Sequence, residues 1–376
     1  MTAATKRDST RNPWLDVCRS SAILLVVLGH GIEYLEPLFP NTVQLFKFTG
    51  FIGVELFFVL SGFLIGQMLM RYADEDLPKW LQTFYMRRMI RTLPNYGLFL
   101  VVNVTLAYMM IRPSDLSELW KYGLFVQNAM TPHPEFFPEA WSLAIEELFY
   151  LGFPLCFLTV AWALRISNRA AIVGTALFVI GVSLFARGIL ASEVISWDEG
   201  IRKIAALRFD GLMVGVLLGW LDRTRWRVLR DKTVPLVLVA GLLFCAAYVS
   251  LMPLSALDSS YFAKTPLFTL TSFGCAGLVI VGIDLRLPSG LESVAALIAK
   301  VSYSAYLVNL PILLIMNQVV RNEGALGVGM FLFFHLATFL VAFVVYRQYE
   351  RVFYRLRDRY FPCRVQKNEP CLQLAA

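Results

Sequence analysis

Apolar runs long enough to cross a lipid bilayer recur along the whole 376-residue chain, and they constrain its fold more than any other feature. A helix that spans the roughly 30 Å hydrocarbon core needs about 20 mostly apolar residues. Only 16% of the residues are charged, whereas about a quarter are charged in an average soluble domain. The sequence therefore excludes an ordinary soluble fold and predicts a membrane protein.

We predict an all-α polytopic membrane protein, with about ten transmembrane helices in one bundle. A single domain is expected over residues 14–357, with short tails at 1–13 and 358–376. The segments between the spans are too short to fold as a separate catalytic domain, so any chemistry is expected inside the bundle. The predicted spans are 14–36, 48–70, 94–111, 142–164, 170–187, 205–221, 234–252, 265–283, 301–320 and 325–346.

Lysine and arginine are distributed unevenly between the segments that connect these spans. If the N-terminus is cytoplasmic, the segments on that side hold 24 of the 34 basic residues, and those on the other side hold 7. The positive-inside rule therefore predicts that both ends of the chain lie in the cytoplasm. Because topology accounts for the net charge of +7, the charge gives no reason to expect a nucleic-acid partner.

Arg19 and His30 interrupt the first apolar run, in the sequence WLDVCRSSAILLVVLGH. Eleven residues apart, they lie on nearly the same face of a helix and about 16 Å apart along its axis. Such groups in a membrane helix usually face a protein interior or a wet cavity, because exposure to hydrocarbon is costly. We expect both side chains to line the same cavity. The structural alternative for His30 is a buried histidine that only bonds to a neighbouring helix.

Arg88 and Arg91 precede the predicted third span and, three residues apart, share a helix face. Guanidinium groups bind phosphates well, so these two and Arg19 are candidates for holding a phosphorylated ligand. The alternative is ordinary positive charge near the cytoplasmic surface.

Glu146 lies in the fourth span and shares a helix face with Ser142. Its carboxylate would orient His30 or neutralise an arginine, and a structural ion pair is the alternative. For Glu55, a structural role and an acceptor-binding role are both open. We expect Arg208 and Asp210 to form a structural ion pair inside the membrane, and the Ser61–Gly62 step to allow close helix packing.

Five segments of the chain together resemble the bacterial acyltransferase-3 family of integral-membrane O-acyltransferases. The last of them more often has histidine where this chain has Asn309, so we expect no essential base at that position. The resemblance covers most of the chain. The segments are the R-x10-H element from Arg19 to His30, GVELFFVLSGFLI at 53–65, FYMRRMIRTLP at 84–94, WSLAIEELFY at 141–150 and SYSAYLVNLP at 302–311.

The resemblance implies an enzyme of the bacterial inner membrane that moves an acyl group from cytoplasmic acyl-CoA to a hydroxyl of a cell-surface or exported carbohydrate. The acyl group is expected to be acetyl, with succinyl as the alternative. Arg19, Arg88 and Arg91 would bind the donor phosphates. His30 would act as the base, with Glu146 as a second catalytic residue, because imidazole titrates near neutral pH. A transient acyl-imidazole is the alternative mechanism.

We expect acyl-CoA as a co-substrate, no bound cofactor and no metal. The other expected partners are membrane lipids and a carbohydrate or lipid-linked oligosaccharide acceptor. Relatives with an appended esterase-like domain pass the acyl group on to it. Without such a segment in these 376 residues, direct transfer or handover to a separate protein is expected. The rival function is a transporter or flippase of a glycan or lipid-linked substrate, which would leave acyl-CoA intact.

Overall fold

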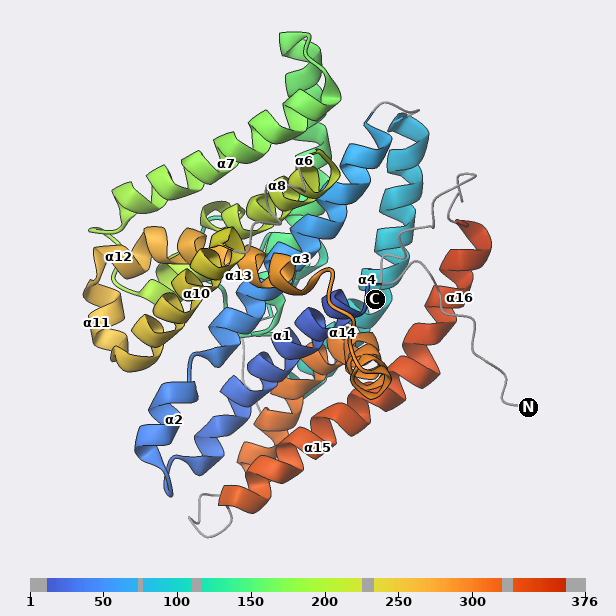
Figure 1. Cartoon of the computed structure of the whole chain (residues 1–376). Coiled ribbons are helices and arrows are strands. Elements are labelled where there is room, and N and C mark those ends of the chain that lie inside the picture. Colours follow the sequence, from blue (N-terminus) through green and yellow to red (C-terminus); the bar gives the residue numbers. More distant parts are fainter. Residues whose placement is uncertain (1–11, 74–76, 110–115, 225–232, 320–326, 363–376) are drawn as a thin grey trace.

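The computed structural model has only helices as regular elements in the residues that it describes, which confirms the all-α prediction for that part of the chain (Figure 1). Most of both predicted tails lies outside the described residues. The described residues are 12–73, 77–109, 116–224, 233–319 and 327–362. The α-helices are α1 (Pro13–Gly31), α2 (Pro40–Phe46), α3 (Thr49–Tyr72), α4 (Leu77–Tyr108), α5 (Leu119–Gly123), α6 (Ala140–Leu164), α7 (Asn168–Leu190), α8 (Asp210–Thr224), α10 (Thr233–Leu251), α11 (Leu254–Ser259), α12 (Tyr261–Lys264), α13 (Pro266–Gly282), α14 (Ser289–Val319), α15 (Gly327–Val345) and α16 (Arg351–Tyr360).

Within the described residues, seven helices are long and apolar enough to cross a membrane, as a multi-pass membrane protein requires. The apolar helix α13 is slightly shorter, α8 has only 15 residues, and α4 carries Asn95 and Asn103 in its apolar half. The predicted count of about ten spans therefore stays a prediction. The seven are Pro13–Leu35, Thr49–Tyr72, Ala140–Leu164, Asn168–Leu190, Thr233–Leu251, Ser289–Gln318 and Gly327–Tyr360.

Two helices begin well before the spans that apolarity predicted. Helix α4 starts at Leu77 rather than at 94 and continues through Pro94, and α14 starts at Ser289 rather than at 301. The apolar pattern ends where a helix leaves the hydrocarbon, but the backbone hydrogen bonds continue into the charged segment. As a result, Arg88 and Arg91 lie on the same rigid helix as the apolar half of α4.

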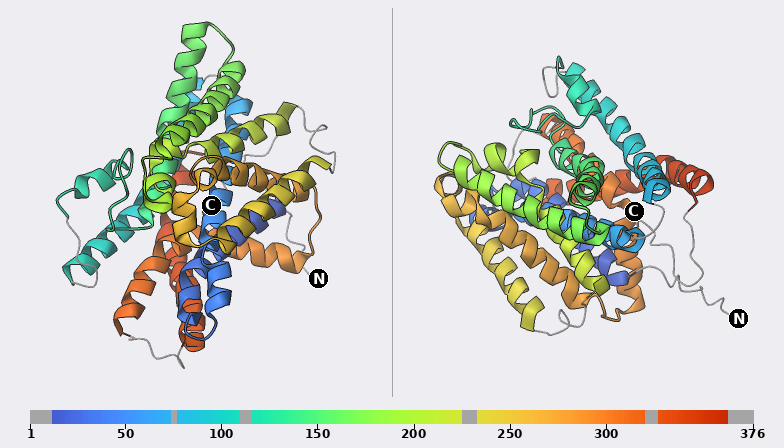
Figure 2. Two further views of the ribbon diagram at one scale, coloured as in Figure 1. Left: turned by 90° about the vertical axis from the view of Figure 1, so that its left-hand side faces the viewer. Right: turned by 90° about the horizontal axis from the view of Figure 1, so that it is seen from above.

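Helix α1 packs against α3 and α14 (Figure 1). The start of α1 is fixed by Asn12, whose side chain accepts a hydrogen bond from the Trp14 N–H at 2.9 Å. Trp14 Nε1 also donates to the carbonyl oxygen of Leu278 in α13 at 3.1 Å. Viewed from above, α4 and α16 lie on one flank of the bundle, and α7 and α10 lie on the other (Figure 2).

Helices α3 and α8 approach each other closely through glycines. A Cβ atom at Gly62 would lie 1.9 Å from the carbonyl oxygen of Leu212, and one at Gly215 would lie 2.3 Å from that of Val59. No side chain fits at these contacts, so small residues let the two backbones meet. The close packing predicted for the Ser61–Gly62 step is confirmed.

Four charged side chains form a fully buried ion network between α3, α7 and α8. Arg187 Nη2 lies 2.8 Å from Asp210 Oδ2, and Arg208 contacts both Glu55 and, at 3.9 Å, Asp210. The predicted Arg208–Asp210 pair is thus part of a larger, electrically balanced cluster, and Glu55 has a structural partner.

The same two arginines hold the loop that precedes α8. Arg187 Nη1 donates to the carbonyl oxygen of Leu207 at 2.6 Å, and Arg208 Nη1 donates to that of Arg202 at 3.0 Å. The network therefore positions residues 202–207. The side chains of Arg202 and Lys203 in this loop border the same cavity as His30.

Candidate active site

Two adjoining cavities lie inside the bundle: α1, α3, α6 and α14 border both, and α4 borders one of them through Arg88, Arg91 and Thr92. We call the cavity lined by His30 the histidine cavity; its volume is about 300 Å³. The cavity lined by Arg19, Arg88 and Arg91 is the arginine cavity, with a volume of about 80 Å³. The polar residues that line the arginine cavity include Arg19, Ser61, Arg88, Arg91, Ser142 and Glu146. The charged and titratable residues that line the histidine cavity are His30, Glu33, Lys47, Glu139, Asp198, Arg202 and Lys203.

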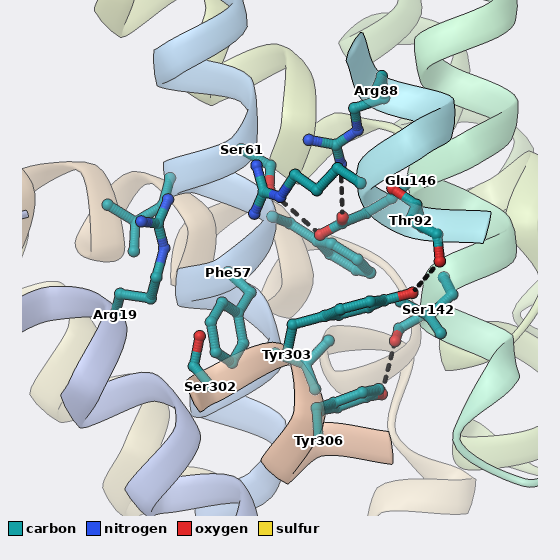
Figure 3. A pocket seen from close by; sticks show the side chains of 15 residues that line it. Arg19, Phe57, Ser61, Arg88, Thr92, Ser142, Glu146, Ser302, Tyr303 and Tyr306 are labelled. Atoms are coloured by element: carbon teal, nitrogen blue, oxygen red, sulfur yellow. Dashed lines mark hydrogen bonds and ion pairs between the residues drawn. The ribbon is translucent and has the colours of Figure 1, made fainter. Parts of the chain in front are cut away.

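The arginine cavity is lined by all three arginines predicted to bind phosphate and by Glu146. Figure 3 shows Glu146 beside Arg88, with Arg19 apart from them. Three guanidinium groups and one carboxylate give its lining an excess of two positive charges. Such a lining favours an anionic ligand, and phosphate is the group that guanidinium binds with the best geometry.

Glu146 neutralises an arginine and does not reach His30. Its Oε2 atom lies 3.3 Å from Arg88 Nη2 and accepts a hydrogen bond from the Tyr150 hydroxyl at 3.1 Å. Its Oε1 atom accepts from Ser61 Oγ at 3.2 Å. Arg88 also stacks on Tyr150, with its guanidinium carbon 3.5 Å from the ring centroid. The contact with Arg88 fits both the neutralising role and the structural ion pair that were expected as alternatives for Glu146, and it does not fit the orienting of His30.

Part of the arginine cavity is apolar. Leu60 and Phe57 lie on α3 with Ser61, and Leu143 lies on α6 beside Ser142. A ligand that fits this cavity would thus have an anionic part at the arginines and a less polar part between α3 and α6. The apolar lining residues are Val54, Phe57, Phe58, Leu60 and Leu143.

His30 is held by Asn309 of α14. Its Nδ1 atom lies 2.6 Å from Asn309 Oδ1. The amide nitrogen of Asn309 donates to the carbonyl oxygens of Tyr306, at 2.6 Å, and Ala305, at 3.1 Å. The amide oxygen therefore faces His30, so Nδ1 carries the hydrogen and Nε2 is the nitrogen left to accept a proton. An amide does not titrate, so Asn309 positions the histidine and cannot replace it as a base.

The histidine cavity has a balanced set of charges, three acidic and three basic, in contrast to the arginine cavity. Asp198 pairs with Arg202 and lies 3.0 Å from Lys203. Burial raises the pKa of Asp198, but the two cations lower it to about 2, so the carboxylate is ionised at neutral pH. Phe48, Phe51 and Trp141 add aromatic surface. Carboxylates beside aromatic rings favour an uncharged ligand rich in hydroxyl groups.

The expectation that Arg19 and His30 line the same cavity is wrong. The two side chains do point from one face of α1, but they border different cavities. The reason is that α3 and α14 insert Val54 and Tyr306 between them. These two are the residues that border both cavities.

Reasoning from sequence missed the contacts of three residues beside the site, Tyr150, Tyr306 and Asn309; of these, Asn309 was expected only not to be an essential base. Tyr306 and Asn309 are three apart on α14 and so share a face, which is the signal that would have suggested a joint role. Tyr150 is four residues after Glu146, and that spacing predicts their contact. Among the described residues, no group of three or more histidine, cysteine or acidic side chains is arranged to hold a metal ion.

Comparison with known proteins gives a family model and several relatives. The model of the acyltransferase domain matches residues 12–347. O-acetyltransferase OatA of Staphylococcus aureus is 27% identical over 365 residues, which cover 89% of this chain and 56% of OatA. A putative O-acetyltransferase of Staphylococcus aureus strain COL is 26% identical over 230 residues, which cover 56% of this chain and 34% of that protein. The chain spans about half the length of OatA. No solved structure matches it.

Proposed function

The chain belongs to the acyltransferase-3 family, and from that premise we propose that it transfers an acetyl group from acetyl-CoA to a hydroxyl of a cell-envelope carbohydrate. One observation carries the proposal: a cavity lined by three arginines adjoins a second cavity lined by a histidine whose Nδ1 atom is held by Asn309. Phosphate binding and general-base catalysis are the two tasks that transfer from a phosphorylated thioester to a hydroxyl requires.

The donor would bind in the arginine cavity. Arg19, Arg88 and Arg91 would hold phosphates of acyl-CoA, while the thin pantetheine chain and the acyl group would lie along the apolar lining. Because the connecting segments on the side of Arg88 and Arg91 are rich in basic residues, this cavity would open to the cytoplasm of a bacterial inner membrane. Helices α4, α8 and α13 would then cross the membrane with the seven helices that are long and apolar enough to do so, and both ends of the chain would be cytoplasmic.

The acceptor would bind in the histidine cavity, whose balanced charges and aromatic rings suit a sugar. His30 Nε2 would take the proton from the acceptor hydroxyl while the hydroxyl oxygen attacks the thioester carbonyl carbon. The carbon–sulfur bond breaks as the ester forms. The thiolate of CoA leaves into the arginine cavity and takes a proton from water there, and His30 releases the proton that it took to water in the histidine cavity.

Arg91→Ala is expected to raise the KM for acetyl-CoA about 10- to 100-fold with little change in kcat, because a charged hydrogen bond to a bound phosphate is worth about 1.5–3 kcal/mol. Steady-state kinetics at varied acetyl-CoA measures this. Arg87→Ala is the matched control: it removes a neighbouring charge on α4, but Arg87 pairs with Asp358 at 3.2 Å and does not line the cavity. An equal rise in KM in both variants would show that Arg91 contributes only general positive charge and does not contact the donor.

Asn309→Leu is expected to lower kcat at least about tenfold, because His30 loses the acceptor that fixes its tautomer and ring orientation. Asn309→Asp keeps an oxygen in the same place and is expected to retain most of the activity. The measurement is kcat as a function of pH in the two variants. Unchanged kcat in Asn309→Leu would show that His30 does not depend on this contact.

The function itself is tested with the purified protein in proteoliposomes. Acetyl-CoA and a glycan extract from a strain deleted for the gene are added, and free CoA thiol and glycan masses are measured. An acetyl mass increment on the glycan, with matching thiol release, is the expected result. Intact acetyl-CoA together with movement of the glycan across the bilayer would favour a transporter and overturn the proposal.

A further inference from the structure

A single layer of side chains separates the arginine cavity from the histidine cavity. On α3 and α14, Val54 and Tyr306 border both cavities. On α6 the change falls between adjacent residues, since Trp141 borders the histidine cavity and Ser142 borders the arginine cavity. On each of these three helices, the residues that border the arginine cavity and those that border the histidine cavity thus meet at one point along the helix.

Helix α1 shows the same division over a longer stretch. Arg19 borders the arginine cavity, whereas Val26, Gly29 and His30 border the histidine cavity. Val26 is seven residues, or about 10 Å, further along the helix than Arg19. The layer therefore crosses the bundle between the proposed phosphate sites and the proposed base.

Tyr306 is the larger of the two side chains that border both cavities. Its hydroxyl lies 2.5 Å from Ser142 Oγ and donates to the carbonyl oxygen of Glu139 at 3.3 Å (Figure 3). Its ring meets Phe57 edge-on, with centroids 6.5 Å apart. The hydroxyl thus ties α14 to the start of α6 on both sides of the layer. Neutral hydrogen bonds of this kind are weak enough to break and re-form in each turnover.

We propose that Tyr306, closed by its hydrogen bond to Ser142, is the gate through which the acyl end of the donor reaches His30. This inference rests on the proposed function. With the phosphates held at the arginines, the thioester carbon has to enter the layer to meet an acceptor activated by His30. Tyr306 and Val54 then limit the size of the acyl group that passes. The closed gate also keeps His30 from activating water against a bound thioester. Tyr306 is a positioning residue in this scheme, and no covalent bond forms to it.

The first test removes the hydrogen bond between Tyr306 and Ser142 by replacing either residue. Tyr306→Phe and Ser142→Ala keep nearly the same volume, and both are expected to raise acceptor-independent hydrolysis of acetyl-CoA about tenfold, the effect of losing one hydrogen bond. Tyr96→Phe is the matched control, because this buried tyrosine of α4 donates to the carbonyl oxygen of Tyr122 at 3.0 Å and borders neither cavity. Hydrolysis that stays at the wild-type rate in both variants would overturn the gate.

The second test removes the ring. Tyr306→Ala is expected to raise kcat/KM for hexanoyl-CoA relative to acetyl-CoA about tenfold, whereas Tyr306→Phe leaves the ratio unchanged, because only the alanine opens space in the layer. An unchanged ratio in Tyr306→Ala would show that the layer does not select acyl size.

A third test needs no activity. Ser302→Cys places a thiol in the arginine cavity, and a small membrane-impermeant thiol reagent is added to proteoliposomes from the side of the histidine cavity. Labelling is expected to be slow with Tyr306 present and at least about tenfold faster with Tyr306→Ala, after subtraction of the same proteins without Ser302→Cys. If the wild type does not turn over acetyl-CoA but labelling responds, the proposed function fails and the gate stands. If the wild type is active and labelling does not respond, the gate fails alone.

Discussion

Replacing His30 with alanine is expected to lower kcat for acyl transfer about 10²- to 10⁴-fold, the range that a positioned general base contributes. The only proton acceptor that the geometry leaves available in this side chain is Nε2, since Nδ1 is occupied by Asn309 at 2.6 Å. Release of CoA thiol in the presence of the glycan acceptor measures the loss. Membrane insertion and acetyl-CoA binding are expected to be retained, because the arginine cavity lies on the other side of the Val54–Tyr306 layer.

A second histidine provides the matched control. His335 of α15 makes a local contact, with its Nδ1 atom 2.8 Å from the carbonyl oxygen of Phe331, and it borders neither cavity. His335→Gln is therefore expected to keep the wild-type kcat. Full activity in His30→Ala would rule out His30 as the base, and an equal loss in His335→Gln would point to a packing effect shared by both histidines.

Asp210→Ala is expected to destabilise the protein by about 3–5 kcal/mol, because it leaves a buried arginine without its counter-charge. Arg187 and Asp210 are fully inaccessible to solvent, and their closest N–O distance is 2.8 Å. Denaturant unfolding in detergent measures the loss. The double variant Arg187→Met with Asp210→Leu is expected to recover part of the stability, because it leaves neither a buried arginine nor a buried aspartate of this pair without its counter-charge.

The comparison for this prediction is an ion pair with one exposed partner, since the Arg87 side chain is 9% exposed. Arg87 and Asp358 are 3.2 Å apart, but the Asp358 side chain is 57% exposed, so Asp358→Ala is expected to cost about 0–1 kcal/mol. Similar losses in the two alanine variants would mean that burial does not set the strength of the Arg187–Asp210 pair. In that case the buried network would not be what holds the loop before α8.

Much of the bundle follows from sequence because a membrane helix has to be apolar over a fixed length. The charged residues singled out within or just before the apolar runs were sound guides to position: Arg19, Arg88, Arg91 and Glu146 line one cavity. The pattern of a single helix does not show which side chains the neighbouring helices place beside it. Arg19 and His30 share a face of α1, yet side chains from α3 and α14 fill the space between them.

The role of Asn309 was hidden for a related reason. From sequence it was only a position where similar proteins more often have histidine, and an amide is not a base. Its contact with His30 joins residues 279 positions apart in the chain, so it depends on how α14 is rotated against α1. The start of α4 at Leu77 was missed because apolarity reports where the hydrocarbon ends and not where the helix ends.

The layer formed by Val54 and Tyr306 also bears on the electrical work of each turnover. If both cavities hold water, most of the membrane potential falls across this thin layer. The acyl group is uncharged, but the proton released at His30 and the thiolate left beside the arginines are on opposite sides. Each transfer then separates one unit charge, which costs about 2.3 kcal/mol against 100 mV. A strongly polarised membrane would therefore oppose transfer unless the proton returns to the thiolate through the open gate.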